Sequence, residues 1–382
     1  MDVSLYFHIP FCTKKCPYCH FYSLPDQAGL QSIFQTSIAL EWQRKVPLLA
    51  GNRIVSIYFG GGTPTLFAPQ GIGAILQMIA QSDLNIAPDC EITIEANPEK
   101  IDLQLLKELR RLTINRISIG VQSLDDQSLQ ILNRAHTARQ AENAVHDAYA
   151  AGFENISIDL MYDLPWQTET SWSTTLNRIR HLPITHSSLY NLTIEPHTLF
   201  YQKQKDLRPA MPSPAKSLRL LNMAIYELEN LKLHRYEISA FAKNNMISRH
   251  NSGYWTGRPF LGFGPSAFSY WDSSRFQNVA HLHRYAQALT KGESIIAFSE
   301  TLPYPANVNE LFAIQLRMIE GVSEAKFPLP PDTIANLQKL KQAKLLTCRQ
   351  NQWKLTKRGT LFYDTVAESI ISEEDATQSQ QP

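Results

Sequence analysis

Short apolar segments alternate with helical stretches through the first half of the chain, and this alternation constrains the fold more than any other feature. The expected strands are 3–8, 54–59, 91–96, 116–121, 155–160 and 187–192. The intervening segments are long enough for crossover helices, and 103–111 and 127–151 carry apolar residues at helical spacing. This pattern predicts parallel strand pairing, in a barrel or in a doubly wound sheet.

Residues suited to a binding site follow directly after these strands. A cysteine loop follows the first strand, a glycine turn over 60–64 the second, and Glu95 ends the third. Gln122 and Asp159 lie at or near the ends of the next two. A parallel barrel gathers all C-terminal strand ends on one face, whereas a doubly wound sheet concentrates its ligand near one switch point. We therefore expect an α/β fold with an incomplete (β/α)6 barrel that is open on one side.

The alternation stops near residue 205, and the rest of the chain is expected to form other units. A helix is expected over 215–231, followed by an aromatic stretch. Helices over 310–320, 333–345 and 359–371, with a hairpin over 346–355, resemble a winged-helix layout. The predicted units are a partial barrel with the cofactor site (1–205), an extension (206–295), a small, mainly helical winged-helix-like domain (296–371) and a disordered tail (372–382).

The overall charge excludes several classes of partner. The chain carries 36 Lys and Arg against 35 Asp and Glu. This balance, which also holds over 310–382, gives no footprint for nucleic acid or for an anionic membrane surface. No apolar stretch approaches the roughly 18 residues that a membrane span needs.

Five cysteines without a secretory segment indicate a reducing compartment. We expect a soluble cytoplasmic protein that reaches membranes only peripherally, through its partners.

Cys12, Cys16 and Cys19 form a C-x3-C-x2-C motif. A [4Fe–4S] cube takes four ligands, usually cysteine thiolates. Three protein ligands leave one iron open to another molecule, which favours chemistry over plain electron transfer. A structural zinc site is the alternative, with His8 or His20 as the fourth ligand.

Several other residues carry little weight when taken singly. Cys90 and Cys348 are isolated and fit buried small hydrophobic positions. Glu95 and Asp159 could hold ligand hydroxyls or an amine, but carboxylates are also favoured as helix caps. Arg134, on an expected helix, could be a surface charge.

Taken together, the motifs resemble a known family. The C-x3-C-x2-C motif and the GGGTP turn at 60–64 are similar to those of the radical S-adenosylmethionine (SAM) superfamily. The segments YFHIPFC at 6–12, SIGVQS at 118–123, NRAH at 133–136 and IDLM at 158–161 resemble the HemN/HemW family within it. This family comprises oxygen-independent coproporphyrinogen III oxidases and related haem chaperones.

The resemblance implies a set of cofactor contacts. Cys12, Cys16 and Cys19 would hold a [4Fe–4S] cluster, and the amine and carboxylate of SAM would chelate its open iron. Backbone groups of the glycine turn would pair with that amine, and Arg134 with the carboxylate. The positions that match SAM contacts in the family are Tyr6, Phe21, Gly61, Gly62, Thr63, Glu95, Gln122, Arg134 and Asp159.

Three features separate the two branches of the family. The oxidase motif continues to a further cysteine, where this chain has Phe21, and only five residues precede Tyr6, where the oxidases carry a longer segment. An H-N-x-x-Y-W motif, associated with haem binding in the chaperones, comprises His250, Asn251, Tyr254 and Trp255. Without the resemblance, His250 would be interpreted as a hydrogen-bonded loop histidine, and Tyr254 and Trp255 as core aromatics.

The resemblance therefore implies a HemW-like haem chaperone that carries haem as cargo to acceptor haemoproteins and lacks coproporphyrinogen III dehydrogenase activity. The alternative is an oxygen-independent coproporphyrinogen III oxidase, which converts propionates to vinyls by radical decarboxylation. A third hypothesis, an electron-transfer or scaffold protein with a vestigial cluster, is disfavoured because the SAM-contacting set is intact.

Overall fold

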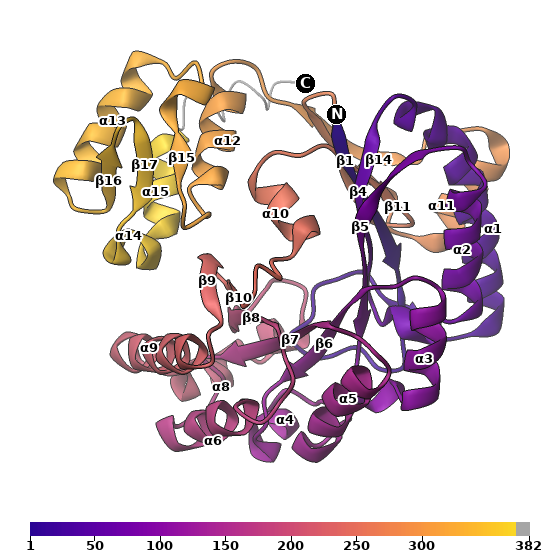
Figure 1. Cartoon of the computed structure of the whole chain (residues 1–382), viewed down its shortest axis with the longest axis horizontal. Coiled ribbons are helices and arrows are strands. Elements are labelled where there is room, and N and C mark those ends of the chain that lie inside the picture. The colour runs from indigo at the N-terminus through magenta and orange to yellow at the C-terminus, as the bar shows by residue number, and fades with distance from the viewer. Residues whose placement is uncertain (372–382) are drawn as a thin grey trace.

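One 12-stranded sheet curves through most of the computed structural model, which describes residues 1–371 (Figure 1). Its centre is a run of parallel neighbours: β1 (Asp2–Ile9), β4 (Arg53–Gly61), β5 (Asn85–Ala96), β6 (Arg116–Gln122), β7 (Asn155–Tyr162) and β8 (His186–Asn191). The edge strands of the sheet are not paired with each other. The expectation of an incomplete barrel is therefore confirmed.

The segment 206–295 extends this sheet at both edges. On one side, β11 (Phe260–Phe263) runs parallel to β1, and β12 (Phe268–Trp271), β13 (Ser274–Asn278) and β14 (Ile296–Thr301) follow antiparallel. On the other side, β10 (Ala240–Ala242) pairs with β8, and β9 (His234–Glu237) pairs with β10. The proposed barrel and extension thus share one sheet, and β14, from the start of the proposed C-terminal domain, also belongs to it.

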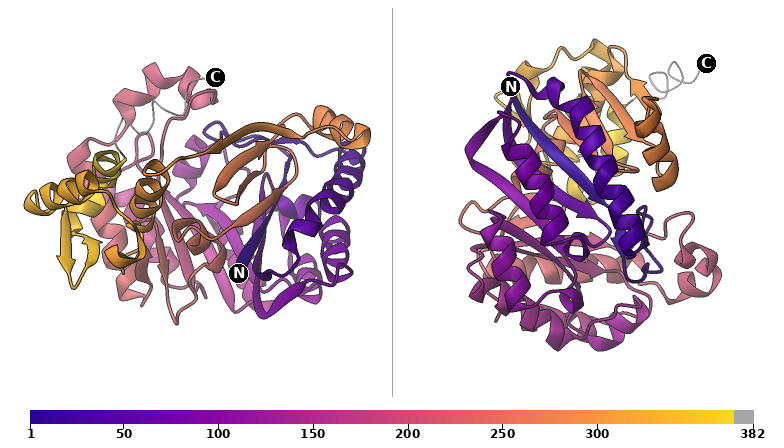
Figure 2. Two further views of the ribbon diagram at one scale, coloured as in Figure 1. Left: turned by 90° about the horizontal axis from the view of Figure 1, so that it is seen from above. Right: turned by 90° about the vertical axis from the view of Figure 1, so that its right-hand side faces the viewer.

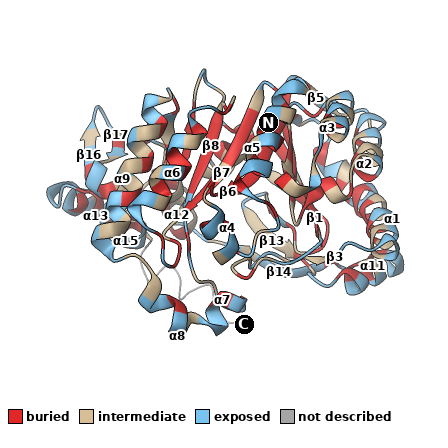
Figure 3. Cartoon of the chain, turned by 90° about the horizontal axis from the view of Figure 1, so that it is seen from below, coloured by how far each residue is buried: buried red, intermediate tan, exposed pale blue. Residues whose placement is uncertain are grey.

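Helices cover the convex face of the sheet, as Figure 1 shows. They are α1 (Ala28–Lys45), α2 (Gln70–Ala80), α3 (Leu103–Arg111), α5 (Ala138–Ala150), α6 (Glu169–Ile179), α9 (Pro214–Asn230) and, packed on α1, α11 (Leu282–Lys291). The buried residues line the strands and the inner sides of these helices (Figure 3). Phe7 stacks between Phe59 and Phe263, with ring centroids 5.3 and 4.8 Å away. Each such fully buried ring stabilises the fold by about 1.5–3 kcal/mol.

The prediction of one continuous helix over 127–151 is wrong. The structure has α4 (Asp126–Ile131) and α5, separated by a short loop. Asp125 accepts a hydrogen bond from the backbone of Ser128 at the start of α4, and Thr137 forms a capping box with Gln140 at the start of α5. Because each cap starts a new helix, the segment forms two helices although its apolar residues recur at helical spacing throughout. Arg134 consequently lies in the loop and not on a helix.

Other short elements connect the larger ones. They are β2 (Phe11–Cys12), β3 (Leu24–Pro25), α7 (Leu199–Gln202), α8 (Gln204–Leu207) and α10 (Arg249–Trp255). Helix α10 lies inside the curve of the sheet (Figure 1) and contacts β4.

A second hydrophobic core forms beyond β14, around Phe312, Trp353 and Val366. Its elements are α12 (Ala306–Gln315), β15 (Val322–Ser323), α13 (Pro331–Gln342), β16 (Leu346–Arg349), β17 (Gln352–Leu355), α14 (Lys357–Leu361) and α15 (Tyr363–Ile370). We call 306–371 the C-terminal domain; it lies at the opposite end of the molecule from α1 and α2 (Figure 2).

The expected hairpin over 346–355 is present, but two helices differ from expectation. Helix α12 begins after Pro305 and ends before 320, and the helix expected over 359–371 is broken at Phe362. The tail proposed over 372–382 lies outside the described residues. Over residues 1–371, no helix combines the length and the apolar character needed to cross a membrane.

Candidate functional site

The cysteine loop after β1 and the glycine turn after β4 are joined by backbone hydrogen bonds. Gly62 N–H donates to Ile9 O at 2.8 Å, and Thr63 N–H donates to Phe11 O at 2.7 Å. A Cβ atom at Gly62 would lie 2.6 Å from Phe11 O and 3.0 Å from Cys12 Sγ. Only glycine allows the two loops to approach so closely.

The three motif cysteines are free, partly buried thiols. Cys12 ends the short strand β2, and Cys19 N–H donates to Cys16 O at 3.1 Å, which closes a turn. Burial raises the pKa of the Cys12 and Cys19 thiols, and the neighbouring Cys16 raises both further. The three sulfur atoms therefore lie within electrostatic reach of one another.

Neither histidine that was considered for a zinc site completes one. His8 Nδ1 is hydrogen-bonded to Tyr6 Oη at 3.1 Å and its Nε2 to Tyr22 O at 2.9 Å, so both ring nitrogens have partners. His20 is exposed, with its ring 4.6 Å from that of Phe21. Across the described residues, no group of three or more His, Cys, Asp or Glu side chains is arranged to hold a metal ion, so the three motif thiols would have to draw closer together to hold a cluster.

A hydrogen-bond chain links the glycine turn to the cysteine loop through Asn97 and Arg134. Asn97 Nδ2 donates to Thr63 Oγ1 at 2.9 Å, and Arg134 Nη2 donates to Asn97 Oδ1 at 2.7 Å. Arg134 Nη1 donates to Cys16 Sγ at 3.5 Å. Sequence reasoning missed Asn97 as a site residue, although it follows Glu95 in the loop after β5 and could have been found there.

Two half-buried carboxyl groups lie beside this hydrogen-bond chain. Glu95 accepts from Tyr58 Oη at 2.8 Å and from Gly61 N–H at 3.2 Å. Asp159 accepts from Ser118 Oγ at 3.4 Å. Burial raises the pKa of Asp159 and raises that of Glu95 to about 7. Tyr58 was also missed, because its position in the middle of an apolar strand gives no functional signal.

Some buried polar atoms here have no partner among the described residues. They include Gln122 Oε1 and Arg134 Nε. Gln122 adopts a left-handed backbone conformation, with φ 63°, at the end of β6. Buried polar groups are normally hydrogen-bonded. These unpaired atoms, the half-buried carboxyls and the close-fitting glycine turn fit a polar ligand with amine, carboxylate and hydroxyl groups, as SAM has.

The structure brings most of the predicted SAM residues to one face of the barrel. Arg134 lies in the loop between α4 and α5, and the others lie at or near the C-terminal ends of β4 to β7: Gly61, Gly62, Thr63, Glu95, Gln122 and Asp159. Tyr6 lies farther inside, against the stacked ring of Tyr58. Phe21 lies beyond the cysteine loop, with 53% of its surface exposed.

The raised pKa of Glu95 predicts a pH-dependent stability. Its carboxyl has a pKa of about 7 in the folded chain, against an ordinary 4.5, chiefly because of burial. The folded state therefore holds this proton more tightly than the unfolded state. The contribution of Glu95 to the free energy of unfolding is complete below pH 4.5. It falls by about 3 kcal/mol as the pH rises from there to about 7.

We expect Glu95→Gln to remove this pH-dependent loss of unfolding free energy, since the glutamine side chain has the same shape as that of glutamate but does not ionise. Urea unfolding of both proteins across the interval between the two pKa values measures the difference, with Asp159 unchanged in each. Parallel pH profiles for the two proteins would contradict the prediction.

The H-N-x-x-Y-W motif forms helix α10. His250 is buried, with Nδ1 hydrogen-bonded to Ser56 Oγ at 3.0 Å and Nε2 to Tyr254 Oη at 2.8 Å. Its ring stacks on Tyr58 at 4.8 Å. Burial lowers the pKa of His250 to about 3, aided by the positive charges of Arg258 and Arg116. The ring is therefore neutral, and both of its nitrogens are occupied.

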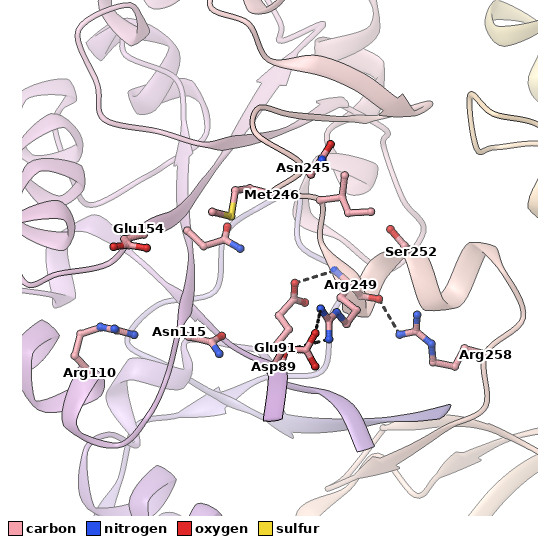
Figure 4. Close-up of a pocket in the computed structure, with 12 residues that line it drawn as sticks. Asp89, Glu91, Arg110, Asn115, Glu154, Asn245, Met246, Arg249, Ser252 and Arg258 are labelled. Carbon is pink, nitrogen blue, oxygen red and sulfur yellow. Dashed lines mark hydrogen bonds and ion pairs between the residues drawn. The ribbon is translucent and has the colours of Figure 1, made fainter. Parts of the chain in front are cut away.

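Acidic residues of β5 hold the start of α10. Glu91 accepts from the backbone N–H groups of Arg249 and His250 at 2.8 and 2.9 Å. Asp89 pairs with the Arg249 side chain at 2.8 Å, and Arg258 donates to the Arg249 carbonyl at 2.9 Å. Figure 4 shows these groups around a polar pocket of about 500 Å³. This pocket lies at the N-terminal strand ends, away from the cysteine loop.

The last residue of α10 faces the C-terminal domain. The Arg317 guanidinium lies over the Trp255 ring at 4.3 Å and near the Tyr363 ring at 5.2 Å. The motif therefore connects the interior of the barrel, through His250, to the C-terminal domain, through Trp255.

The chain is similar to several known proteins. Residues 6–179 match the radical SAM superfamily. The chain is 31% identical to "Heme chaperone HemW" of Haemophilus influenzae over 395 residues, 97% of this chain and 98% of that protein. It is also 31% identical to "Heme chaperone HemW" of Bacillus subtilis, over 85% of this chain and 86% of that protein.

Two further similarities cover almost the whole chain. A Danio rerio protein, "Radical S-adenosyl methionine domain-containing protein 1, mitochondrial", is 30% identical over 98% of this chain and 88% of its own length. Coproporphyrinogen III oxidase (HemN) of Escherichia coli shares the fold with a TM-score of 0.84, at 24% identity, over 97% of this chain and 90% of that one. The chain belongs to the radical SAM superfamily and, within it, to the HemW branch of the HemN/HemW family.

Proposed function

We propose that this protein is a haem chaperone that binds haem and transfers it to acceptor haemoproteins. The observation that carries the proposal is the similarity to proteins named heme chaperone HemW along nearly the full chain. Phe21, at the position where the oxidase motif has its further cysteine, supports it. We place its action in the reducing cytoplasm, in keeping with five free thiols.

Membership of the superfamily implies a [4Fe–4S] cluster and SAM. We propose that Cys12, Cys16 and Cys19 hold the cluster and that the groups around Gly62, Gln122 and Arg134 hold SAM. When bound, the two would supply radical chemistry at the open iron. In that arrangement Arg134 would pair with the carboxylate of SAM through its unpartnered Nε, and Asp159 or Glu95 would accept from ribose hydroxyls.

The role of His250 as a haem ligand is a separate prediction. As placed, Nε2 can reach iron only by giving up its hydrogen bond to Tyr254. If His250 is the ligand, Tyr254→Phe frees that nitrogen and we expect tighter haem binding, whereas His250→Phe weakens binding at least about tenfold. Absorbance titration with haem measures both variants. Equal affinities for the two variants and the unmodified protein would exclude His250 as the ligand.

The proposed function is tested by two assays on one anaerobically reconstituted sample. The first supplies SAM, a reductant and coproporphyrinogen III; the second is a titration with haem. We expect haem binding at one site per chain and no conversion to protoporphyrinogen. Conversion would overturn the chaperone proposal in favour of the oxidase. Absence of both activities would leave only the fold and the family.

A further inference from the structure

A crevice of about 720 Å³ separates the barrel from the C-terminal domain. The helices of the outer ring cover the earlier parallel strands, but the alternation of strands and helices ends after β8. The C-terminal domain instead lies beside β8 and the β9–β10 hairpin (Figure 1). The crevice lies between α9, these strands and the α14–α15 corner. Its volume falls in the range of pockets that enclose a cofactor-sized ligand.

Exposed apolar side chains line the crevice on two of its elements. Leu218 of α9 is 41% exposed on one wall, and Leu361 and Phe362 are 47% and 49% exposed on the other. Large exposed apolar side chains around one opening mark a site for an apolar ligand or partner. Here they would contact both faces of a flat ring.

Two arginines line the floor of the crevice. Arg235 donates through Nε and Nη2 to the Ile238 carbonyl, an uncharged acceptor, and forms no ion pair within residues 1–371. Arg317 pairs with Glu237 at 3.3 Å, while its Nε is buried without a partner in the described chain. Guanidinium groups of this kind bind carboxylates.

Two acidic side chains also line the crevice. Asp163 is hydrogen-bonded to Ser217 at 2.6 Å, and burial raises its pKa. Asp364 belongs to the lining at the start of α15. Glu237 pairs with Arg317 and also acts electrostatically on Arg235, so within residues 1–371 Arg235 is the arginine of the crevice that has no direct ion pair.

We propose that this crevice, given the haem-binding function proposed above, is where the protein holds its haem. Haem is a flat, largely apolar ring with two carboxylates on one edge. The ring would lie between Leu218 and Phe362, and the carboxylates would reach the guanidinium groups of Arg235 and Arg317. This placement assigns no ligand to the iron.

The placement also gives the H-N-x-x-Y-W motif a role that does not require iron ligation. Trp255 stacks on Arg317, and Tyr363 approaches the same guanidinium. Trp255 would therefore act as a positioning residue that orients Arg317 toward the crevice. His250 and Tyr254, inside the barrel, would hold α10 in place for this purpose.

Haem titrations of the full-length chain test the placement. We expect Leu218→Glu and Phe362→Glu each to weaken haem binding at least about tenfold, because each puts a charge into an apolar wall. Tyr226→Glu is the matched control, because it lies on α9 with Leu218, is 65% exposed and does not line the crevice. It is expected to keep the affinity of the unmodified protein.

Substitutions at Arg235 test whether its positive charge contributes to haem binding. Arg235→Gln is expected to weaken haem binding, and Arg235→Lys, which keeps the charge, to restore most of it. Far-ultraviolet circular dichroism checks that each variant is folded. If the unmodified protein binds haem but folded crevice and Arg235 variants bind it equally well, the crevice placement is overturned and the chaperone proposal stands. If the unmodified protein binds no haem, both fall.

Discussion

Replacing Cys16 with alanine is expected to abolish the visible absorbance of the reconstituted cluster and to reduce bound iron and sulfide to background. Two thiolates, Cys12 and Cys19, would remain for a cube that needs three from the protein. The substitution also removes the sulfur that accepts from Arg134 Nη1 at 3.5 Å, which loosens the link to Asn97. Iron and acid-labile sulfide analysis after anaerobic reconstitution measures the effect.

The matched control for this experiment is Cys348→Ala. Cys348 is a free, half-buried thiol on β16, within the C-terminal domain. Its loss is expected to leave iron, sulfide and absorbance unchanged. Full iron and sulfide in the Cys16 variant would show that the ligand assignment is wrong, whereas loss in both variants would indicate a general sensitivity of the fold to cysteine removal.

Gly62→Ala is expected to have the second large effect, on both stability and SAM binding. The new Cβ would lie 2.6 Å from Phe11 O and 2.9 Å from Pro10 C, so backbone has to move. Such overpacking typically costs about 1–3 kcal/mol. The movement would displace Cys12 and the turn that is proposed to pair with the SAM amine. We expect a lower unfolding free energy and at least about tenfold weaker SAM binding.

Gly29→Ala is the control, because it makes the same substitution at a position where the added methyl group meets no neighbouring atom. A Cβ at Gly29, within α1, would meet nothing within 4 Å. Alanine is expected to stabilise the helix by about 0.5–1 kcal/mol. Urea unfolding and equilibrium dialysis with labelled SAM measure both variants. A Gly62 variant that matches the unmodified protein in both assays would show that the two loops do not need this close approach.

Local patterns in the sequence predict the centre of the barrel well. Five of the six parallel strands lie within two residues of their expected positions, β5 begins six residues earlier than expected, and α3 spans the residues expected of it. A buried strand needs a short apolar run, and a surface helix needs an apolar stripe, so both signals are contained in neighbouring residues. The cysteine motif is equally local, because the spacing of its thiols is set by one loop.

Long-range pairing is less visible in sequence. Strands β9, β10 and β11 have three or four residues each. Strand β10 pairs with β8, β9 with β10, and β11 with β1, in each case only after the chain has returned to the sheet. The break between α4 and α5 was also missed, because its capping residues were outweighed by the apolar periodicity. That break is what allows Arg134 to reach Cys16.

The sequence by itself determined the family, the parallel core and the residues offered to the cluster and SAM, because each depends on motifs of a few consecutive residues. Only the tertiary structure decided that Asn97 joins Thr63 to Arg134, and that His250 is enclosed by Ser56 and Tyr254. It also decided that Trp255 lies against Arg317, 62 residues later in the chain. These contacts depend on which strands become neighbours and on where the C-terminal domain packs, and no local pattern encodes either.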